Sequence, residues 1–216
     1  MPLVNRYEFT VKDMADRLAL CTGDTPAFHA RQIRHWAAAG VLEEIMPTHI
    51  HGHGKTAARV FNTRHLAGCL ILHFYAGQRG DVEFLSTVAG LMRNSTLDRS
   101  DGRILDENAP EKSAVTTDGL GLAMHFARKI ARGEKASDWK IYLQISLTRD
   151  GTLRGGSFTN SPHASSTLSF NWVEERTLNV SALLPCMFRD EDGRPNELAT
   201  GRMLHNGVVQ DFGHEA

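Results

Sequence analysis

The chain has 216 residues, enough for one large domain or two small ones. Its 41% hydrophobic and 23% charged residues are ordinary for a globular protein, and no apolar run is long enough to span a bilayer. The beginning of the chain lacks the basic-then-apolar pattern of a secretory signal, so we expect a cytoplasmic protein without a membrane partner. The scattered cysteines Cys21, Cys69 and Cys186 argue against a disulfide framework or a zinc–thiolate site and predict free thiols.

The net charge of -1 conceals an uneven distribution. Residues 1–65 hold 8 Lys and Arg against 6 Asp and Glu, so this segment is +2 and the remainder is -3. Between Pro26 and His65 five basic residues stand against two acidic ones, with six histidines besides. Because neutralising phosphates dominates affinity for DNA, this segment favours a nucleic-acid partner. The excess is small, and a monomer with this charge would bind DNA weakly, which favours a dimer or a larger assembly.

Two short helices are predicted near the start of the chain. Thr10 and Asp13 form a capping pair, apolar residues follow at helical spacing, and Gly23 is a typical stop. Thr25–Pro26 predicts a second start, with Thr as the cap and Pro in the first helical position, and Gly40 ends this helix. Two helices with a tight connection, the second carrying basic and amide side chains, are typical of a helix-turn-helix.

The next segment, 41–62, predicts a two-stranded hairpin with a glycine-rich tip near Gly52–Lys55. Thr63 and Asp81 are expected to cap a third and a fourth helix.

The rest of the chain predicts a helix and a mainly antiparallel sheet. Residues 94–113 have the polar composition of a connector, and a helix is expected between Asp118 and Gly133. Alternating residues at 141–147 and then Asp150–Gly151 predict a strand and a hairpin turn. Further strands are expected at 167–173 and 177–184, around a Glu-Glu-Arg turn, and a last hairpin at 203–209. The fold class is therefore α+β, with an N-terminal winged helix-turn-helix.

Two motifs of the first half resemble the MerR family of winged-helix regulators. The run Ile33–Trp36 followed by Gly40–Leu42 matches the family's recognition-helix pattern, and Arg59–Phe61 matches its wing signature. The resemblance covers about residues 8–93 and implies a DNA-binding domain over 1–93. Composition and the predicted elements add a connector at 94–113 and an α+β domain at 114–216, which we expect to serve self-association or to bind a partner. The first aromatic position of the family is His35 here, and residues 94–216 lack the family's long dimerisation helix, so metal sensing and promoter untwisting do not carry over.

Candidate DNA contacts lie on the second helix and the hairpin. Arg34 matches a phosphate-contacting position of the resembling family, and the side chains of Arg31 and Gln32 suit guanine and adenine edges. His35 suits a phosphate or a packing role, while Trp36 is expected in the core. The candidate DNA-contacting residues are therefore Arg31, Gln32, Arg34, His35, Lys55 and Arg59.

Metal and enzyme sites are not expected. His49, His51 and His53 alternate, so on a strand they share one face and suit either a metal or, as we favour, phosphates of DNA. In the latter case binding strengthens as pH falls below about 7. No Gly-x-Ser-x-Gly or His-Glu-x-x-His motif occurs and the glycine clusters fit no phosphate loop, so we expect neither an enzyme nor a cofactor.

The leading hypothesis is a sequence-specific regulator of transcription that binds double-stranded DNA as a homodimer. Two alternatives stay open. One is a DNA-architectural or excisionase-like recombination factor, because winged helices also serve there. The other is a ligand- or protein-binding module in which the sheet binds the ligand or partner and the winged helix mediates protein contacts.

Overall fold

Capping side chains set the ends of the first helices. A computed structural model describes residues 8–51, 58–77, 81–94, 97–98, 119–134, 140–159, 174–200, 202–205 and 208–211. Helix α1 (Val11–Thr22) begins at Thr10, whose hydroxyl accepts the Asp13 N–H at 3.2 Å, and ends at Gly23 with φ of +80°. Helix α2 (Pro26–Ala38) begins at Thr25. Both predicted starts are confirmed.

The segment after α2 differs in part from its prediction. Val41–Ile45 forms a short helix, α3, directly after Gly40, whose φ is +79°. The hairpin prediction was wrong here because Val41, Leu42 and Ile45 are all buried, and one helical turn brings residues at this spacing to the same side. The hairpin itself is present but shorter, with β1 (His49–His51) antiparallel to β2 (Ala58–Val60). Its predicted tip lies at 52–57, outside the described residues.

Two longer helices complete the first half. In α4 (Thr63–Ala76) the cap is Asn62, one residue before the predicted Thr63, and its side-chain oxygen accepts the N–H groups of Arg64 and His65. Helix α5 (Val82–Asn94) is capped as predicted by Asp81, which accepts the Phe84 N–H at 2.8 Å. Within the described ranges, no helix is both long and apolar enough to cross a membrane.

The second half contains helix α6 (Gly119–Ala131) and a four-stranded sheet in the order β3-β5-β4-β6. The strands are β3 (Leu97–Asp98), β4 (Tyr142–Leu147), β5 (Leu153–Thr159) and β6 (Glu174–Asn179). Only the β3–β5 pair of this sheet is parallel, and Gly151, with φ of +79°, lies in the predicted β4–β5 turn. Residues 143–147 of β4 are all buried, so the strand is confirmed although both of its faces are covered.

The end of the sheet departs most from the sequence prediction. The Glu-Glu-Arg segment lies in strand β6 rather than in a turn, and residues after Asn179 are helical rather than extended. Asn179 caps α7 (Val180–Leu183) by accepting the Ala182 N–H at 3.0 Å, and the 3-10 helix η3 (Leu184–Phe188) follows. The strand predicted at 167–173 lies outside the described residues. A final short helix, α8 (Glu197–Thr200), precedes the predicted hairpin of β7 (Arg202–His205) and β8 (Val208–Asp211).

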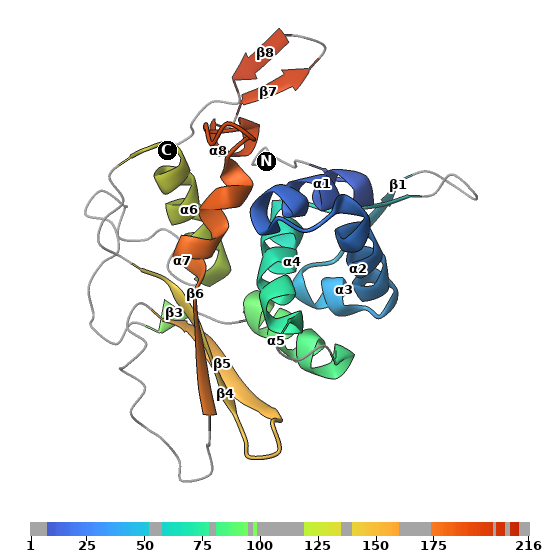
Figure 1. Cartoon of the computed structure of the whole chain (residues 1–216), viewed down its shortest axis with the longest axis vertical. Coiled ribbons are helices and arrows are strands. Elements are labelled where there is room, and N and C mark those ends of the chain that lie inside the picture. Colours follow the sequence, from blue (N-terminus) through green and yellow to red (C-terminus); the bar gives the residue numbers. More distant parts are fainter. Residues whose placement is uncertain are drawn as a thin grey trace, which may run out of the picture.

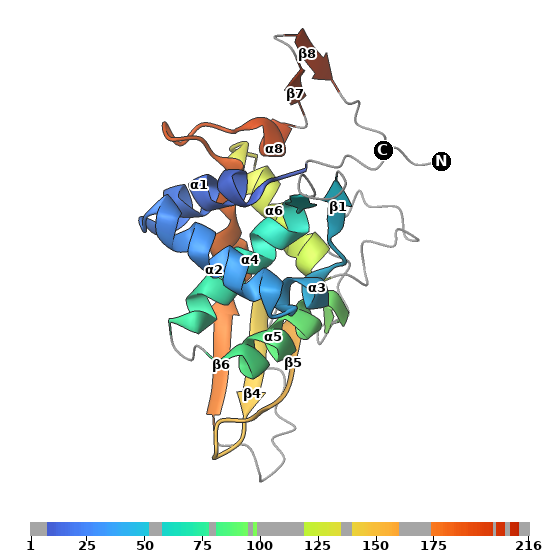
Figure 2. The same cartoon turned by 90° about the vertical axis from the view of Figure 1, so that its right-hand side faces the viewer.

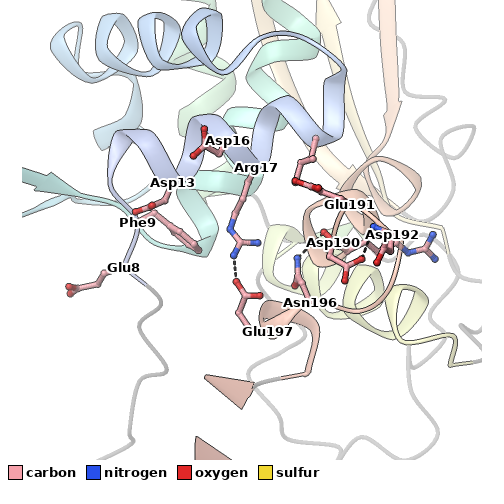
Figure 3. A pocket seen from close by; sticks show the side chains of 12 residues that line it. Glu8, Phe9, Asp13, Asp16, Arg17, Asp190, Glu191, Asp192, Asn196 and Glu197 are labelled. Atoms are coloured by element: carbon pink, nitrogen blue, oxygen red, sulfur yellow. Dashed lines mark hydrogen bonds and ion pairs between the residues drawn. The ribbon is translucent and has the colours of Figure 1, made fainter. Parts of the chain in front are cut away.

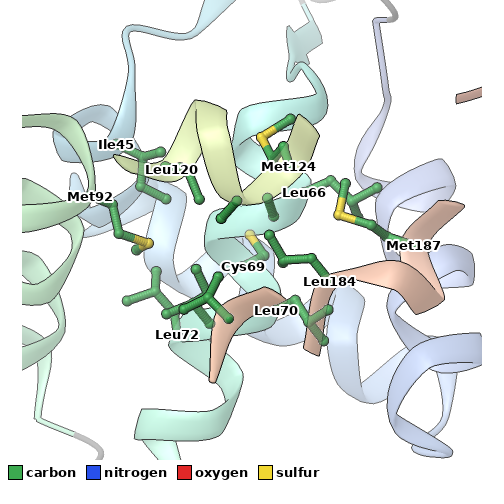
Figure 4. Close-up of a cluster of buried hydrophobic side chains, with 14 of the residues drawn as sticks. Ile45, Leu66, Cys69, Leu70, Leu72, Met92, Leu120, Met124, Leu184 and Met187 are labelled. Atoms are coloured by element: carbon green, nitrogen blue, oxygen red, sulfur yellow. The ribbon is translucent and has the colours of Figure 1, made fainter. Parts of the chain in front are cut away.

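Both halves of the chain contribute to one hydrophobic core. Helices α1 to α5 lie together on one side, with α6, α7 and the sheet on the other, and the β7–β8 hairpin stands apart in both views (Figure 1, Figure 2). Helix α4 lies between them, and Leu66 and Leu70 of α4 gather with Met124 of α6 and Leu184 of η3 (Figure 4). The free cysteines Cys21 of α1 and Cys186 of η3 also pack against this core. The predicted division at 93 and 114 stays a prediction, and the described residues on either side of it share this core.

Close packing between α5 and the sheet gives a stability test. A Cβ on Gly156 of β5 would lie 2.7 Å from the Gln144 carbonyl oxygen and 2.8 Å from Cδ1 of Leu91 in α5. Gly156→Ala should therefore lower the free energy of unfolding by about 1–3 kcal/mol, measured by urea denaturation. The matched control is Gly155→Ala in the same strand, where a Cβ meets nothing within 4 Å. Equal effects of the two substitutions would contradict this packing.

Candidate nucleic-acid interface

Basic side chains gather on the solvent face of α2. Arg31, Arg34 and His35 are exposed, and positions three and four apart lie on neighbouring turns of one helix face. Opposite them Ile33 and Trp36 are buried, with 0% and 3% of their surfaces exposed. Trp36 is thus a core residue, as predicted. The buried pair holds the helix against the body while the guanidinium groups face outward.

The hairpin is fastened to the end of α2 by Arg59. Its Nη1 donates a hydrogen bond to the carbonyl oxygen of Ala37 at 2.7 Å, and the side chain is half-buried. A guanidinium has five N–H donors, so this bond leaves others for a second partner. The residue that the sequence assigned to the wing is therefore also the link between β2 and the last turn of α2.

A second link joins the segment before α1 to the end of the hairpin. Phe9 and Phe61 form an antiparallel bridge, with N–H···O distances of 2.8 and 3.0 Å, and both rings are buried. The chain entering α1 thereby lies beside the chain leaving β2. Together with Arg59, this bridge ties the base of the hairpin to both ends of the α1–α2 unit.

The loop before β1 is held by two ionisable side chains. Burial tends to raise the pKa of Glu43, but hydrogen bonds donated by the Thr48 N–H and hydroxyl outweigh it, so the pKa lies below its usual value. His65 of α4 lies 2.8 Å through Nε2 from the Met46 carbonyl oxygen, and its Nδ1 accepts the Asn62 N–H. Burial lowers the pKa of His65, so the imidazole is neutral and donates to Met46.

Strand β1 of the hairpin extends away from the helices (Figure 1). His49 is exposed, and Ile50 on the other strand face has 65% of its surface exposed. His49 and His51 alternate in β1 as predicted. Lys55 and His53 lie outside the described residues, so their predicted roles at the tip remain predictions.

Gln32 turns away from the exposed arginines. It is half-buried, and its Oε1 lies 3.4 Å from Nδ1 of His73 in α4. His29, one turn earlier in α2, is completely buried, and its ring lies 5.1 Å from that of His73. Burial, and then the neighbouring His73, lower the pKa of His29. Neither His29 nor His73 was predicted from the sequence, because only the fold brings α2 and α4 together here.

An acidic cavity lies elsewhere, between α1 and the segment 189–197 (Figure 3). Its volume is about 820 Å³. Arg17 points into it and forms an ion pair with Glu197 of α8. The acidic residues that line it are Glu8, Asp13, Asp16, Asp190, Glu191, Asp192 and Glu197. Because these carboxylates carry negative charge and repel phosphates, the cavity does not suit a nucleic acid, in contrast to the basic outer face of α2.

Comparisons with known proteins add no relative. No protein-family model matches the chain, and neither a curated protein nor a solved structure matches it.

The neutral, buried His65 predicts a decrease of stability in acid. Because its pKa in the folded chain is below the ordinary 6.5, the unfolded chain takes up the proton first as pH falls. His65 should therefore lower the free energy of unfolding by up to about 1.4 kcal/mol per pH unit below its unfolded pKa, measured by urea unfolding from pH 7 to pH 5. His65→Gln should flatten this dependence, and His35→Gln at an exposed position is the control for removing an imidazole. An unchanged slope in His65→Gln would refute the neutral assignment.

Proposed function

We propose that this protein binds double-stranded DNA in a sequence-specific way and regulates transcription. The observation that carries the proposal is the outer face of α2, where Arg31, Arg34 and His35 are exposed beside a hairpin fastened to the same helix. An α-helix fits the major groove of B-DNA, and arginine is the commonest side chain to bind guanine there.

We infer a winged-helix arrangement for this half, in keeping with the MerR resemblance. The support is the order of α1, α2, hairpin and α4, together with the Phe9–Phe61 bridge and the Arg59–Ala37 hydrogen bond. In this arrangement α2 enters the major groove, Arg34 contacts a phosphate as the resemblance implies, and the hairpin with Lys55 meets the flanking backbone. Arg59 both positions the hairpin and offers its remaining donors to a phosphate.

A single α2 face with two arginines provides few phosphate contacts. We therefore infer a homodimer in the cytoplasm that reads two half-sites of a pseudo-palindromic operator. Half-sites one helical turn apart, about 34 Å, place two copies of α2 on one side of the duplex.

The first test removes the two outward arginines. A duplex selected from a random pool by the wild-type chain is titrated by fluorescence anisotropy between about 50 and 200 mM salt. Arg31→Ala with Arg34→Ala should raise Kd at least about tenfold and reduce the salt slope by about 1 for each phosphate that is no longer neutralised. The control is Arg149→Ala, which also removes one positive charge but at an exposed residue near the β4–β5 turn. Unchanged affinity and slope in the double variant would refute DNA binding by α2.

The second test separates positioning from direct binding. Arg59→Ala removes the shorter of two hydrogen bonds to the Ala37 carbonyl, which keeps the Gly40 N–H, so it should lower the free energy of unfolding by about 1 kcal/mol as well as weaken DNA binding. Arg34→Ala, which removes an exposed side chain, should weaken DNA binding alone. Urea unfolding and anisotropy on the two variants measure both effects. Weaker DNA binding in Arg59→Ala with full stability would show that Arg59 binds DNA without positioning the hairpin.

A further inference from the structure

Three ligand-type side chains from three elements converge on the inner side of α2. Asp24 lies in the turn between α1 and α2, His29 in the first half of α2, and His73 in the last turn of α4. One donor atom from each lies within 4.8 Å of the other two. Nε2 of His73 is 3.4 Å and Nε2 of His29 is 4.0 Å from Oδ2 of Asp24. At zinc bonds of about 2.0–2.1 Å, tetrahedral ligand atoms are separated by about 3.3 Å, so small side-chain shifts close the site.

The imidazole of His29 is incompletely satisfied by its surroundings. It is completely buried, and within the described part of the chain its Nδ1 has no hydrogen-bond partner. Its Nε2 lies 2.7 Å from the hydroxyl of Thr22, which itself donates to the Leu18 carbonyl. Nε2, not Nδ1, is the His29 atom that faces Asp24, and a buried imidazole nitrogen beside a carboxylate and a second imidazole is placed to bind a cation.

Gln32 gives His73 the orientation of a metal ligand. Its Oε1 accepts from Nδ1–H of His73 at 3.4 Å, which leaves the Nε2 lone pair directed at the carboxylate of Asp24. Two acceptors facing each other repel unless a proton or a cation lies between them. Metal-bound histidines characteristically donate their second ring N–H to an oxygen in this way. Gln32 is thus a positioning residue rather than a ligand.

We propose that Asp24, His29 and His73 bind a divalent transition-metal ion of the Zn²⁺ class. Two imidazoles and one carboxylate suit Zn²⁺ and similar ions, whereas Mg²⁺ and Ca²⁺ take oxygen ligands. The side chain of Asp24 is 47% exposed and that of His73 is 25% exposed, which gives the ion a path from solvent and a position for a water ligand. Binding replaces the Thr22–His29 hydrogen bond and clamps the start of α2 to the end of α4.

The test is a titration of the full, chelator-dialysed chain with Zn²⁺ in the absence of DNA, followed by calorimetry. We expect one ion per chain, no binding of Mg²⁺, and a rise in Tm of about 5–10 °C when Zn²⁺ exceeds Kd a hundredfold. His73→Gln and Asp24→Asn change partly exposed side chains and should each raise Kd about 100-fold. Because no DNA is present, failure here is independent of the proposed regulatory function.

Further variants separate this site from the hairpin histidines. His125→Gln on α6, and the triple variant with Gln at His49, His51 and His53, should keep the wild-type Kd. Co²⁺ bound to the wild-type chain should give visible four-coordinate absorption bands that disappear in His73→Gln and persist in both controls. Gln32→Ala should raise Kd about tenfold, and Gln32→Glu should restore it. No Zn²⁺ binding by the wild-type chain, or binding abolished only in the hairpin variant, would overturn the proposal.

Discussion

The structure depends on the burial of α4. Ten of its 14 residues are buried, and a helix that is apolar on nearly every side is stable only when other elements surround it. Helices α1, α3 and α5 cover it from the first half of the chain, and α6 and η3 cover it from the second. A Cβ on Gly68 would lie 2.4 Å from Cδ1 of Ile45, so α3 approaches α4 closely at a position where glycine leaves room. The folding of the two halves is therefore linked through this one helix.

The same helix reaches both ends of the candidate interface. At its first turn, His65 binds the Met46 carbonyl and so holds the loop that enters the hairpin. At its last turn, His73 faces Asp24 and Gln32 at the start of α2. Helix α4 thus contacts both the start of α2, which carries the exposed arginines, and the loop that enters the hairpin. A buried helix with polar groups at its two ends supplies a rigid frame for the surface that we propose as the DNA-binding face.

Local signals in the sequence were sufficient where short-range chemistry decides the structure. Thr10 with Asp13, Thr25–Pro26, Asp81 and the Asp150–Gly151 turn act within a few residues, and the structure confirms each of them. The segment after Asn179 was misjudged because its β-branched and apolar residues favour a strand, although the Asn cap and Pro185 indicate a helical start. For β4, alternation predicted the strand correctly but not the burial of both its faces, which comes from layers that are distant in sequence.

The roles of polar residues were harder to predict than the elements that carry them. Gln32 follows Arg31 in the sequence, but one residue turns an α-helix by about 100°, and the half-buried Gln32 faces inward, where α4 places His73 beside it. Arg59 likewise donates one hydrogen bond to the Ala37 carbonyl, a residue far from it in sequence. His29 is buried, but its neighbours in sequence do not distinguish it from other helix residues. Each of these contacts joins residues from separate elements, so none has a periodic signature. The chemistry of α2 therefore depends on two faces. The basic outer face can be predicted from the sequence, whereas the contacts of the inner face form only when α4 packs against α2.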